Sequence, residues 1–385
     1  MSEISLVVDG IIFQKNPNGG IARIFRELLP RMCELETGLK IDLLIDGPIE
    51  SRLPVHPQIH VRKTLPLRRK ALAKGLWRTS LYPLRALGRN AWNRLRQLWV
   101  GSGRNRVWHS TFFTYAPNWK GQEVVTVHDM IPERFPGILN DPMDAAGREQ
   151  KRRCVERASA VICDSETTRR EFEKFYTIEG QAVTVTPLAS SQVFRPLPID
   201  QWHPSELPHH PFLLYVGNRV HYKNFSLLLE TYANWEMRQQ VHLVVAGPPW
   251  SIAEERFLRS SGLVERIHYF RDVEDEQLCQ LYNAAAALVS PSIFEGFGLP
   301  VLEALACGCP VVASKIPATC EVAGECPIYF DPGHPETLLS ALDRALQEGR
   351  DSPRTRAGLE RAGLYSWDRT AQATLQVYRQ ILSCH

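Results

Sequence analysis

The sequence lacks any apolar run approaching the ~18 residues that span a bilayer. Its first residues, MSEISLVVDG, have neither the basic start nor the long apolar stretch of a secretory signal. Nine cysteines are scattered along 385 residues without a CxxC spacing. An odd number of dispersed cysteines in a chain of this length is typical of a reduced protein. We therefore expect a cytoplasmic location.

Acidic residues are absent between positions 51 and 122, which hold fifteen Lys or Arg residues. The rest of the chain carries the other 30 basic residues against all 42 acidic ones, so the charge is strongly asymmetric. This basic segment predicts a localised anionic partner. A helix that begins near Leu81 would place apolar and aromatic residues beside arginines. This pattern favours binding to an anionic membrane surface. The apolar stripe is Leu84, Gly88, Trp92, Leu95 and Trp99, and the basic one is Arg85, Arg89 and Arg96.

Two alternatives remain open for the basic segment. The helix could pack its stripe on its own domain and leave the arginines in solvent. The segment could also bind nucleic acid, since it contains five tryptophans. The nucleic-acid interpretation explains the charge but none of the motifs described below, so no nucleic acid is expected as a partner.

The remaining composition is that of a globular protein, with 44% hydrophobic and 23% charged residues. Short apolar, β-branched runs alternate with helical stretches in both halves, which predicts parallel sheets covered on both faces. The predicted strands are 5–9, 41–45, 124–127, 161–163 and 183–185 in the first half, and 212–216, 241–246, 267–270, 286–290 and 311–313 in the second. A segment with five prolines, 195–211, separates the halves and indicates a linker. We predict an α/β fold of two doubly wound, Rossmann-like domains facing a cleft, over residues 1–194 and 195–365. Residues 366–385 would form a closing helix.

The most informative motif follows a predicted strand that ends at Ser290. Pro300 suits the first turn of a helix that Gly308 would close. The amides of Phe297, Gly298 and Leu299 would then point at an anion such as a diphosphate. Two carboxylates, Glu295 and Glu303, flank this site and would accept hydrogen bonds from sugar hydroxyls. The alternative is a helix start whose glutamates only complement the helix dipole.

Two further loops predict ligand contacts. Gly19 and Gly20 follow the first strand and open a helix, where they would allow close approach of a ligand to the backbone, although a glycine pair is often only a turn. Arg219 and Lys223 surround a tight turn ahead of a helix beginning near Asn224. Two cations there would neutralise a diphosphate, unless both are simply solvated. Asn224 is also predicted to bind the donor.

Glu295 and Glu303, separated by seven residues in FEGFGLPVLEALACGCPVVAS, resemble the Glu-x7-Glu motif of retaining glycosyltransferases of family 4. Other segments have family counterparts in the same order, and together they cover most of the chain outside about 50–120. These segments are VVDGIIFQKNPNGGIARIFREL, VTVHDMIPERFP, LLYVGNRVHYKNFSLLLETY and YSWDRTAQATLQVYRQIL.

The resemblance implies a GT-B fold, with the C-terminal helix closing back on the N-terminal domain, and a set of roles. His128 would contact the transferred sugar, with Asp129 orienting its ring, and Glu303 would bind the ribose. The loop with Gly19 and Gly20 would approach the donor phosphate, and the backbone at Arg271 and Val273 would hold the nucleotide base. The family often has Arg-Lys where this chain has Tyr222-Lys223, so Arg219 is the expected substitute for that arginine.

The resemblance also implies the reaction. A nucleotide-diphosphate sugar would donate a hexose, with retention, to a saccharide hydroxyl, and no metal or other cofactor is expected. The branch favours GDP-mannose over UDP- or dTDP-sugars and bacterial cell-surface polysaccharide as the product. With the basic segment, it favours a lipid-linked acceptor and a peripheral position on the inner face of the plasma membrane. A nucleotide-sugar epimerase of the same fold is the alternative enzyme.

Overall fold

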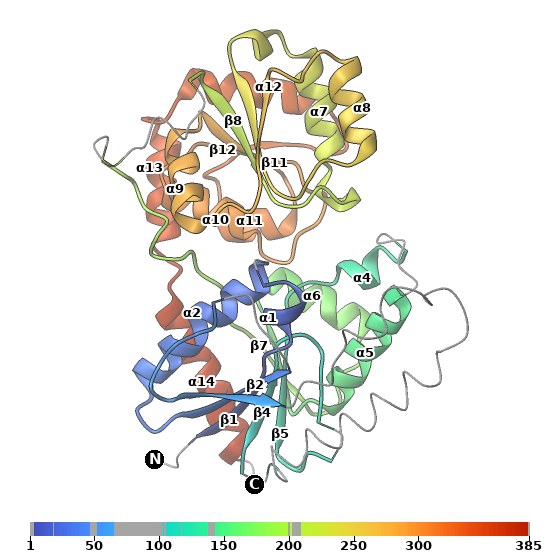
Figure 1. The fold of residues 1–385 in the computed structure, drawn as a ribbon, viewed down its shortest axis with the longest axis vertical. Helices are drawn as coiled ribbons and strands as arrows, with labels where there is room; N and C mark the ends of the chain where they lie inside the picture. The colour runs from blue at the N-terminus through green and yellow to red at the C-terminus, as the bar shows by residue number, and fades with distance from the viewer. Residues whose placement is uncertain are drawn as a thin grey trace.

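The computed structural model describes residues 4–17, 19–46, 52–64, 103, 105–116, 118–137, 143–198, 201 and 209–383. Two parallel sheets, each with helices on both faces, form two domains that lie one above the other along the long axis (Figure 1). The predicted α/β architecture of two doubly wound domains is confirmed. The predicted boundary near residue 194 falls between the last strand of the first sheet and the first strand of the second.

The N-terminal sheet has seven strands among the described residues, in the order β3-β2-β1-β4-β5-β6-β7, and all neighbours are parallel. The strands are β1 (Ser5–Asp9), β2 (Lys40–Asp46), β3 (Ile59–Thr64), β4 (Val107–Ser110), β5 (Gln122–Val127), β6 (Ala160–Cys163) and β7 (Ala182–Val185). The helices are α1 (Ile12–Lys15), α2 (Gly20–Leu35), α4 (Ile131–Arg134), α5 (Met143–Arg157) and α6 (Glu166–Phe175).

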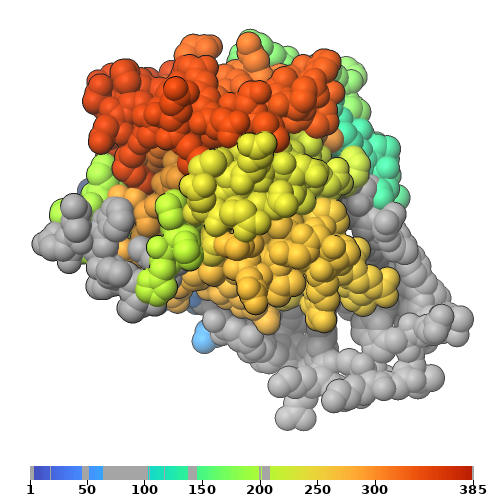
Figure 2. Space-filling view, turned by 90° about the horizontal axis from the view of Figure 1, so that it is seen from above, coloured from blue at the N-terminus to red at the C-terminus, as the bar shows by residue number. Residues whose placement is uncertain are grey.

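The C-terminal sheet has six described strands in the order β10-β9-β8-β11-β12-β13, again all parallel. They are β8 (Phe212–Val216), β9 (His242–Ala246), β10 (Ile267–Phe270), β11 (Ala287–Ser290), β12 (Val311–Ser314) and β13 (Ile328–Phe330). The helices are α7 (Phe225–Asn234), α8 (Ile252–Ser260), α9 (Asp275–Ala284), α10 (Leu299–Ala306), α11 (Pro317–Ala323), α12 (Glu336–Glu348) and α13 (Pro353–Ala362). Figure 2 shows the outer face of this domain, where α12 packs beside α7.

The last helix, α14 (Trp367–Ser383), returns to the N-terminal domain, as expected, and packs along α2 (Figure 1). Its apolar stripe is buried, including Ala371, Leu375 and Tyr378. The Tyr378 hydroxyl lies 2.5 Å from Nδ1 of His109, a fully buried residue of β4. The helix is therefore fixed to the N-terminal sheet by a polar contact as well as by apolar burial.

Most of the basic segment, including the helix predicted from near Leu81 and its arginines, lies outside the described residues. The described part of the segment contains the edge strand β3, in which Val61, Arg62 and Lys63 are exposed. Among the residues described, no helix combines the length and apolar character needed to cross a membrane.

Candidate functional site

Several of the residues predicted from the sequence lie on loops at the interface between the two domains. The strand order reverses between β1 and β4 in one sheet and between β8 and β11 in the other. Ligands of doubly wound domains bind at the carboxyl ends of strands near such reversals. His128 directly follows β5, Lys223 lies in the turn after β8, and Glu295 follows β11. The contacts below bring these loops together across the domain interface.

Lys223 and Glu295 form an ion pair in the C-terminal domain. Lys223 Nζ donates to Glu295 Oε1 at 2.6 Å, and Ser292 Oγ donates to the same oxygen at 2.7 Å. Burial works to lower the pKa of Lys223, but the charge and hydrogen bond of Glu295, together with the neighbouring Tyr222 and Asp129, outweigh it and the net shift is upward. Within the described part of the chain Oε2 of Glu295 carries no hydrogen bond. The pair thus combines a fixed ammonium charge with an available carboxylate oxygen.

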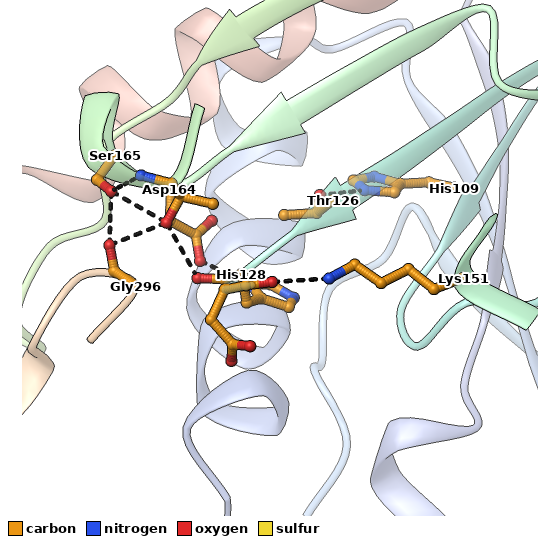
Figure 3. Close-up of polar contacts among 9 residues, drawn as sticks. His109, Thr126, His128, Lys151, Asp164, Ser165 and Gly296 are labelled. Carbon is orange, nitrogen blue, oxygen red and sulfur yellow. Dashed lines mark hydrogen bonds and ion pairs between the residues drawn. The ribbon is translucent and has the colours of Figure 1, made fainter. Parts of the chain in front are cut away.

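His128 is held by a carboxylate, but not by the one expected (Figure 3). Its Nδ1 donates to Asp164 Oδ2 at 2.6 Å. The expectation that Asp129 orients the ring is wrong, because Asp129 Oδ1 instead accepts from the Ile131 amide at 3.0 Å. Burial works to lower the pKa of His128, whereas the charge and hydrogen bond of Asp164 raise it, and the net pKa is raised.

Gly296 joins the two domains at this point. A Cβ on Gly296 would lie 1.9 Å from the carbonyl oxygen of His128, so only glycine permits this approach. The Gly296 carbonyl accepts from Ser165 Oγ at 2.5 Å and from Thr168 Oγ1 at 3.0 Å, both at the start of α6 (Figure 3). Because Gly296 follows Glu295, this contact brings the Lys223–Glu295 pair to the strand ends that carry His128.

Two helix starts from opposite domains also meet here. The helix α2 begins at Gly20, with Gly19 as its N-terminal cap, and a Cβ on Gly20 would lie 3.9 Å from Leu299 Cδ1. Leu299 begins α10, after Gly298 with a φ of +94° that favours glycine. Phe297 is buried with its ring against Tyr365. Two positive helix ends facing one region favour an anionic ligand.

Glu303 lies inside α10 and is buried, at 2% exposure. Its Oε1 accepts from Arg23 Nη1 of α2 at 2.5 Å, and its Oε2 accepts from the Tyr282 hydroxyl at 3.0 Å. Arg23 also pairs with Asp275 at 2.5 Å. Burial raises the pKa of Glu303, with the charge of Arg23 opposing it. In this structure Glu303 therefore contributes to a bridge between the domains.

Two family models match this chain. One, described as glycosyl transferases group 1, matches residues 200–361, and the other, described as glycosyltransferase family 4, matches residues 18–189. O-antigen chain mannosyltransferase B of Escherichia coli is 31% identical over 307 residues, covering 74% of this chain and 77% of that protein. The chain therefore belongs to the family 4, group 1 glycosyltransferases. D-inositol 3-phosphate glycosyltransferase of Acidothermus cellulolyticus is 24% identical and covers 94% of this chain and 81% of its own.

Solved structures identify the fold of this glycosyltransferase as GT-B. Sucrose-phosphate synthase from Thermosynechococcus elongatus superposes with a TM-score of 0.77 at 20% identity, covering 99% of this chain and all of that one. HepE of Anabaena, solved in complex with UDP, has a TM-score of 0.69 at 16% identity and covers 98% of this chain and 100% of that one. The fold implied by the sequence motifs is thereby confirmed.

Arg219 of this glycosyltransferase is bound to α8 and not to the Lys223–Glu295 pair. Its Nε donates to Glu254 Oε1 of α8 at 2.6 Å, and its guanidinium lies 4.4 Å from the Trp250 ring centroid. The side chain is 4% exposed, and Nη1 is buried without a hydrogen-bond partner among the described residues. The charge of Arg219 is thus already paired, and its role toward a diphosphate stays a prediction.

The remaining predicted residues lie on nearby loops. Asn224 is the N-terminal cap of α7 and has a φ of +51°. Arg271 is exposed and pairs with Asp272 at 3.0 Å, while Val273 packs against the core. No contact in the described structure links Arg271 or Val273 to the Lys223–Glu295 pair.

Three residues that the sequence does not predict belong to the site or its interface. Asp164 holds His128, Arg23 reaches Glu303, and Glu321 of α11 accepts from the amides of Glu166 and Thr167 at the start of α6, at 2.6 and 2.8 Å. For Asp164 a signal was present, since it follows a predicted strand at the same edge as His128. The other two partners come from the opposite domain, and their spacing in sequence gives no sign of the contact.

A cavity of about 300 Å³ lies away from these residues. It lies where the chain crosses between the domains and is lined by residues of α2, α13, α14 and the connecting segment, including Arg31, Phe194 and Trp367. None of the predicted site residues lines it.

Proposed function

We propose that the chain transfers a hexose, with mannose favoured, from a nucleotide-diphosphate sugar to a saccharide hydroxyl with retention of configuration. The observation that carries the choice of sugar is the 31% identity to an O-antigen chain mannosyltransferase. That similarity supports GDP-mannose as donor, with UDP- and dTDP-sugars as alternatives. It also supports a lipid-linked acceptor in bacterial cell-surface polysaccharide assembly.

The diphosphate of the donor meets positive charge from several directions in this proposal. Lys223 supplies an ammonium group, and the starts of α2 and α10 supply backbone amides at Gly20 and at Gly298–Leu299. Arg219 adds a second cation near the end of β8 once the diphosphate replaces Glu254 as its partner. These groups stabilise the departing diphosphate, so we propose that transfer proceeds without a metal ion.

The transferred sugar lies between the domains in this proposal. Glu295 accepts from sugar hydroxyls through its available oxygen, and His128 contacts the sugar from the N-terminal domain. The acceptor hydroxyl attacks the anomeric carbon from the face that the diphosphate leaves, which retains the configuration. Its proton passes to the leaving phosphate, so the reaction needs no protein nucleophile. Glu303 binds the ribose once Arg23 shares or releases its carboxylate.

A thermal-shift panel tests the donor class. GDP is expected to raise the melting temperature more than UDP, dTDP or ADP at equal concentration. A nucleotide stabilises the folded state only when it binds, so the largest shift identifies the nucleotide of the donor. At one hundred times the dissociation constant the stabilisation is about 2.7 kcal/mol. Incorporation of mannose from GDP-mannose into a saccharide acceptor, with and without a chelator, then tests the reaction. A larger shift with UDP or dTDP would contradict the choice of GDP, and stabilisation by RNA alone would contradict the proposed function.

We further propose that the basic segment, residues 51–122, attaches the protein to an anionic membrane surface. Each basic residue near such a surface contributes ~1 kcal/mol. Sedimentation with liposomes is expected to require anionic lipid and to weaken between low and physiological salt. Changing Arg85, Arg89 and Arg96 to Gln together should lower binding, whereas exchanging the exposed Lys174 of α6, outside the segment, should not. Equal sedimentation with neutral vesicles would overturn the proposal.

A further inference from the structure

The geometry around His128 singles out Asp164 as a second residue of the N-terminal half of the site. Strands β5 and β6 are parallel, and Val127 lies opposite Cys163 in their register. The next residues, His128 and Asp164, therefore leave the sheet side by side. Asp164 is fixed from its other side as well, because Ser165 caps α6 and donates to Gly296 of the opposite domain.

The hydrogen bond between them determines which ring nitrogen remains available. Asp164 Oδ2 accepts from Nδ1 at 2.6 Å, so Nδ1 carries a proton in both charge states of the ring. Nε2 is buried and has no hydrogen-bond partner among the described residues. Buried polar atoms are rarely left without a partner, and those that are often have a functional role.

The other charged groups around His128 are otherwise engaged. Lys151 Nζ donates to the Asp129 carbonyl at 2.8 Å and to Glu133 at 3.0 Å, and Asp129 Oδ1 accepts from the Ile131 amide. His109 is wholly buried, and burial lowers its pKa to about 3, so it stays neutral. Asp164 is thus the carboxylate that bonds directly to the His128 ring in the described structure.

We propose that Asp164 is a positioning residue for His128, holding the ring by Nδ1 so that Nε2 is the nitrogen that meets the donor sugar. This inference rests on the proposed function for its sugar ligand. Asp164 itself does not touch the sugar and acts through the orientation and proton state of the ring. Loss of its charge would leave the ring free to protonate at either nitrogen and would favour the neutral form at neutral pH.

The pairing is tested without substrate by ¹⁵N NMR of histidine-labelled protein, with His128→Asn to assign the His128 signals. In the wild-type chain neutral His128 is expected to be protonated at Nδ1. In Asp164→Asn the titration midpoint of His128 should fall, because the charge and hydrogen bond that raise its pKa are lost, and Nδ1 should no longer be uniquely protonated. Asp129→Asn is the matched control, since it removes a neighbouring carboxylate that makes no hydrogen bond to the ring, and Nδ1 should stay protonated. Unchanged His128 signals in Asp164→Asn would overturn the inference.

The consequence for transfer is tested by a double-mutant cycle. Asp164→Asn is expected to lower kcat by about 10- to 100-fold, with little change in binding of the free nucleotide. In a His128→Asn background the same change should cause no further loss, because Asp164 acts only through the ring. An additional loss of tenfold or more in that background, or full activity of Asp164→Asn alone, would overturn the positioning role. Failure of the proposed function would show differently, as absence of transfer by the wild-type chain.

Discussion

Lys223→Ala and Glu295→Gln are each expected to lower sugar transfer by ~10²-fold or more, while the chain stays folded. Lys223 places its ammonium group 2.6 Å from Glu295, and both side chains are mostly but not fully buried, at 15% and 12% exposure. In the proposed reaction the lysine meets charge that develops on the leaving diphosphate. The glutamate holds the reacting sugar, and glutamine keeps its shape but loses the charge.

The two variants should differ in how they affect donor binding. Lys223→Ala removes a contact with the diphosphate and leaves Glu295 without its cationic partner, so binding of the free nucleotide should also weaken. Glu295→Gln should keep nucleotide binding and lose mainly turnover, because its contact is with the sugar. Both are measured as kcat and KM for the donor, with thermal denaturation as the test of folding.

Lys174→Ala is the control for general effects of removing a lysine. Lys174 lies on α6, is 61% exposed and, among the residues that the structure describes, pairs only with Glu171, at 2.6 Å, so its loss should not change transfer. Near-wild-type turnover in either purified site variant would remove that residue from the site. A residue would also be removed from the site if the turnover of its variant fell no further than that of Lys174→Ala.

The sheets could be predicted well because buried parallel strands are continuous apolar runs. β1, β8 and β10 have the bounds expected from the sequence, and the helix after Gly298 begins and ends near its predicted glycine and proline signals. The sequence does not predict β3, β4 and β13. The last two are only four and three residues long, and β3, IHVRKT, is an edge strand that carries basic residues. Local composition alone does not distinguish such segments from loops.

The sequence indicates individual residues of the candidate site, but it does not indicate which of them contact one another. Lys223, Glu295 and His128 stand out because each follows an apolar strand. Their partners depend on register and domain packing, which a single sequence does not encode in any local pattern. Asp164 meets His128 because of the β5–β6 register, and Arg23 meets Glu303 across 280 positions of sequence. For Arg219 the sequence predicts a role toward a diphosphate but gives no sign of its ion pair with Glu254.

Gly296→Ala is expected to have an effect on transfer as large as that of the ion-pair variants, through domain packing rather than chemistry. The added Cβ would lie 1.9 Å from the His128 carbonyl oxygen and 3.0 Å from Asp129 Cβ. The first contact is with backbone at the end of a buried strand, which cannot rotate away as a flexible side chain could. The loop from Glu295 to Gly298 must therefore retreat, and its hydrogen bonds to Ser165 and Thr168 must lengthen or break.

A displacement of about 1 Å at a reacting group can reduce the rate ~10²-fold, so transfer should fall by that factor or more while each domain stays folded. Gly147→Ala is the matched control, because its added Cβ, in the middle of α5, meets nothing within 4 Å and should stabilise the helix slightly. Small-angle scattering should show a more open particle for Gly296→Ala than for Gly147→Ala. Full activity with unchanged dimensions would mean that the contact between Gly296 and His128 is not needed for the reaction. The reaction would then not require His128 and Glu295 to be held together across the domain interface. That result would contradict the proposal that both residues contact the same sugar.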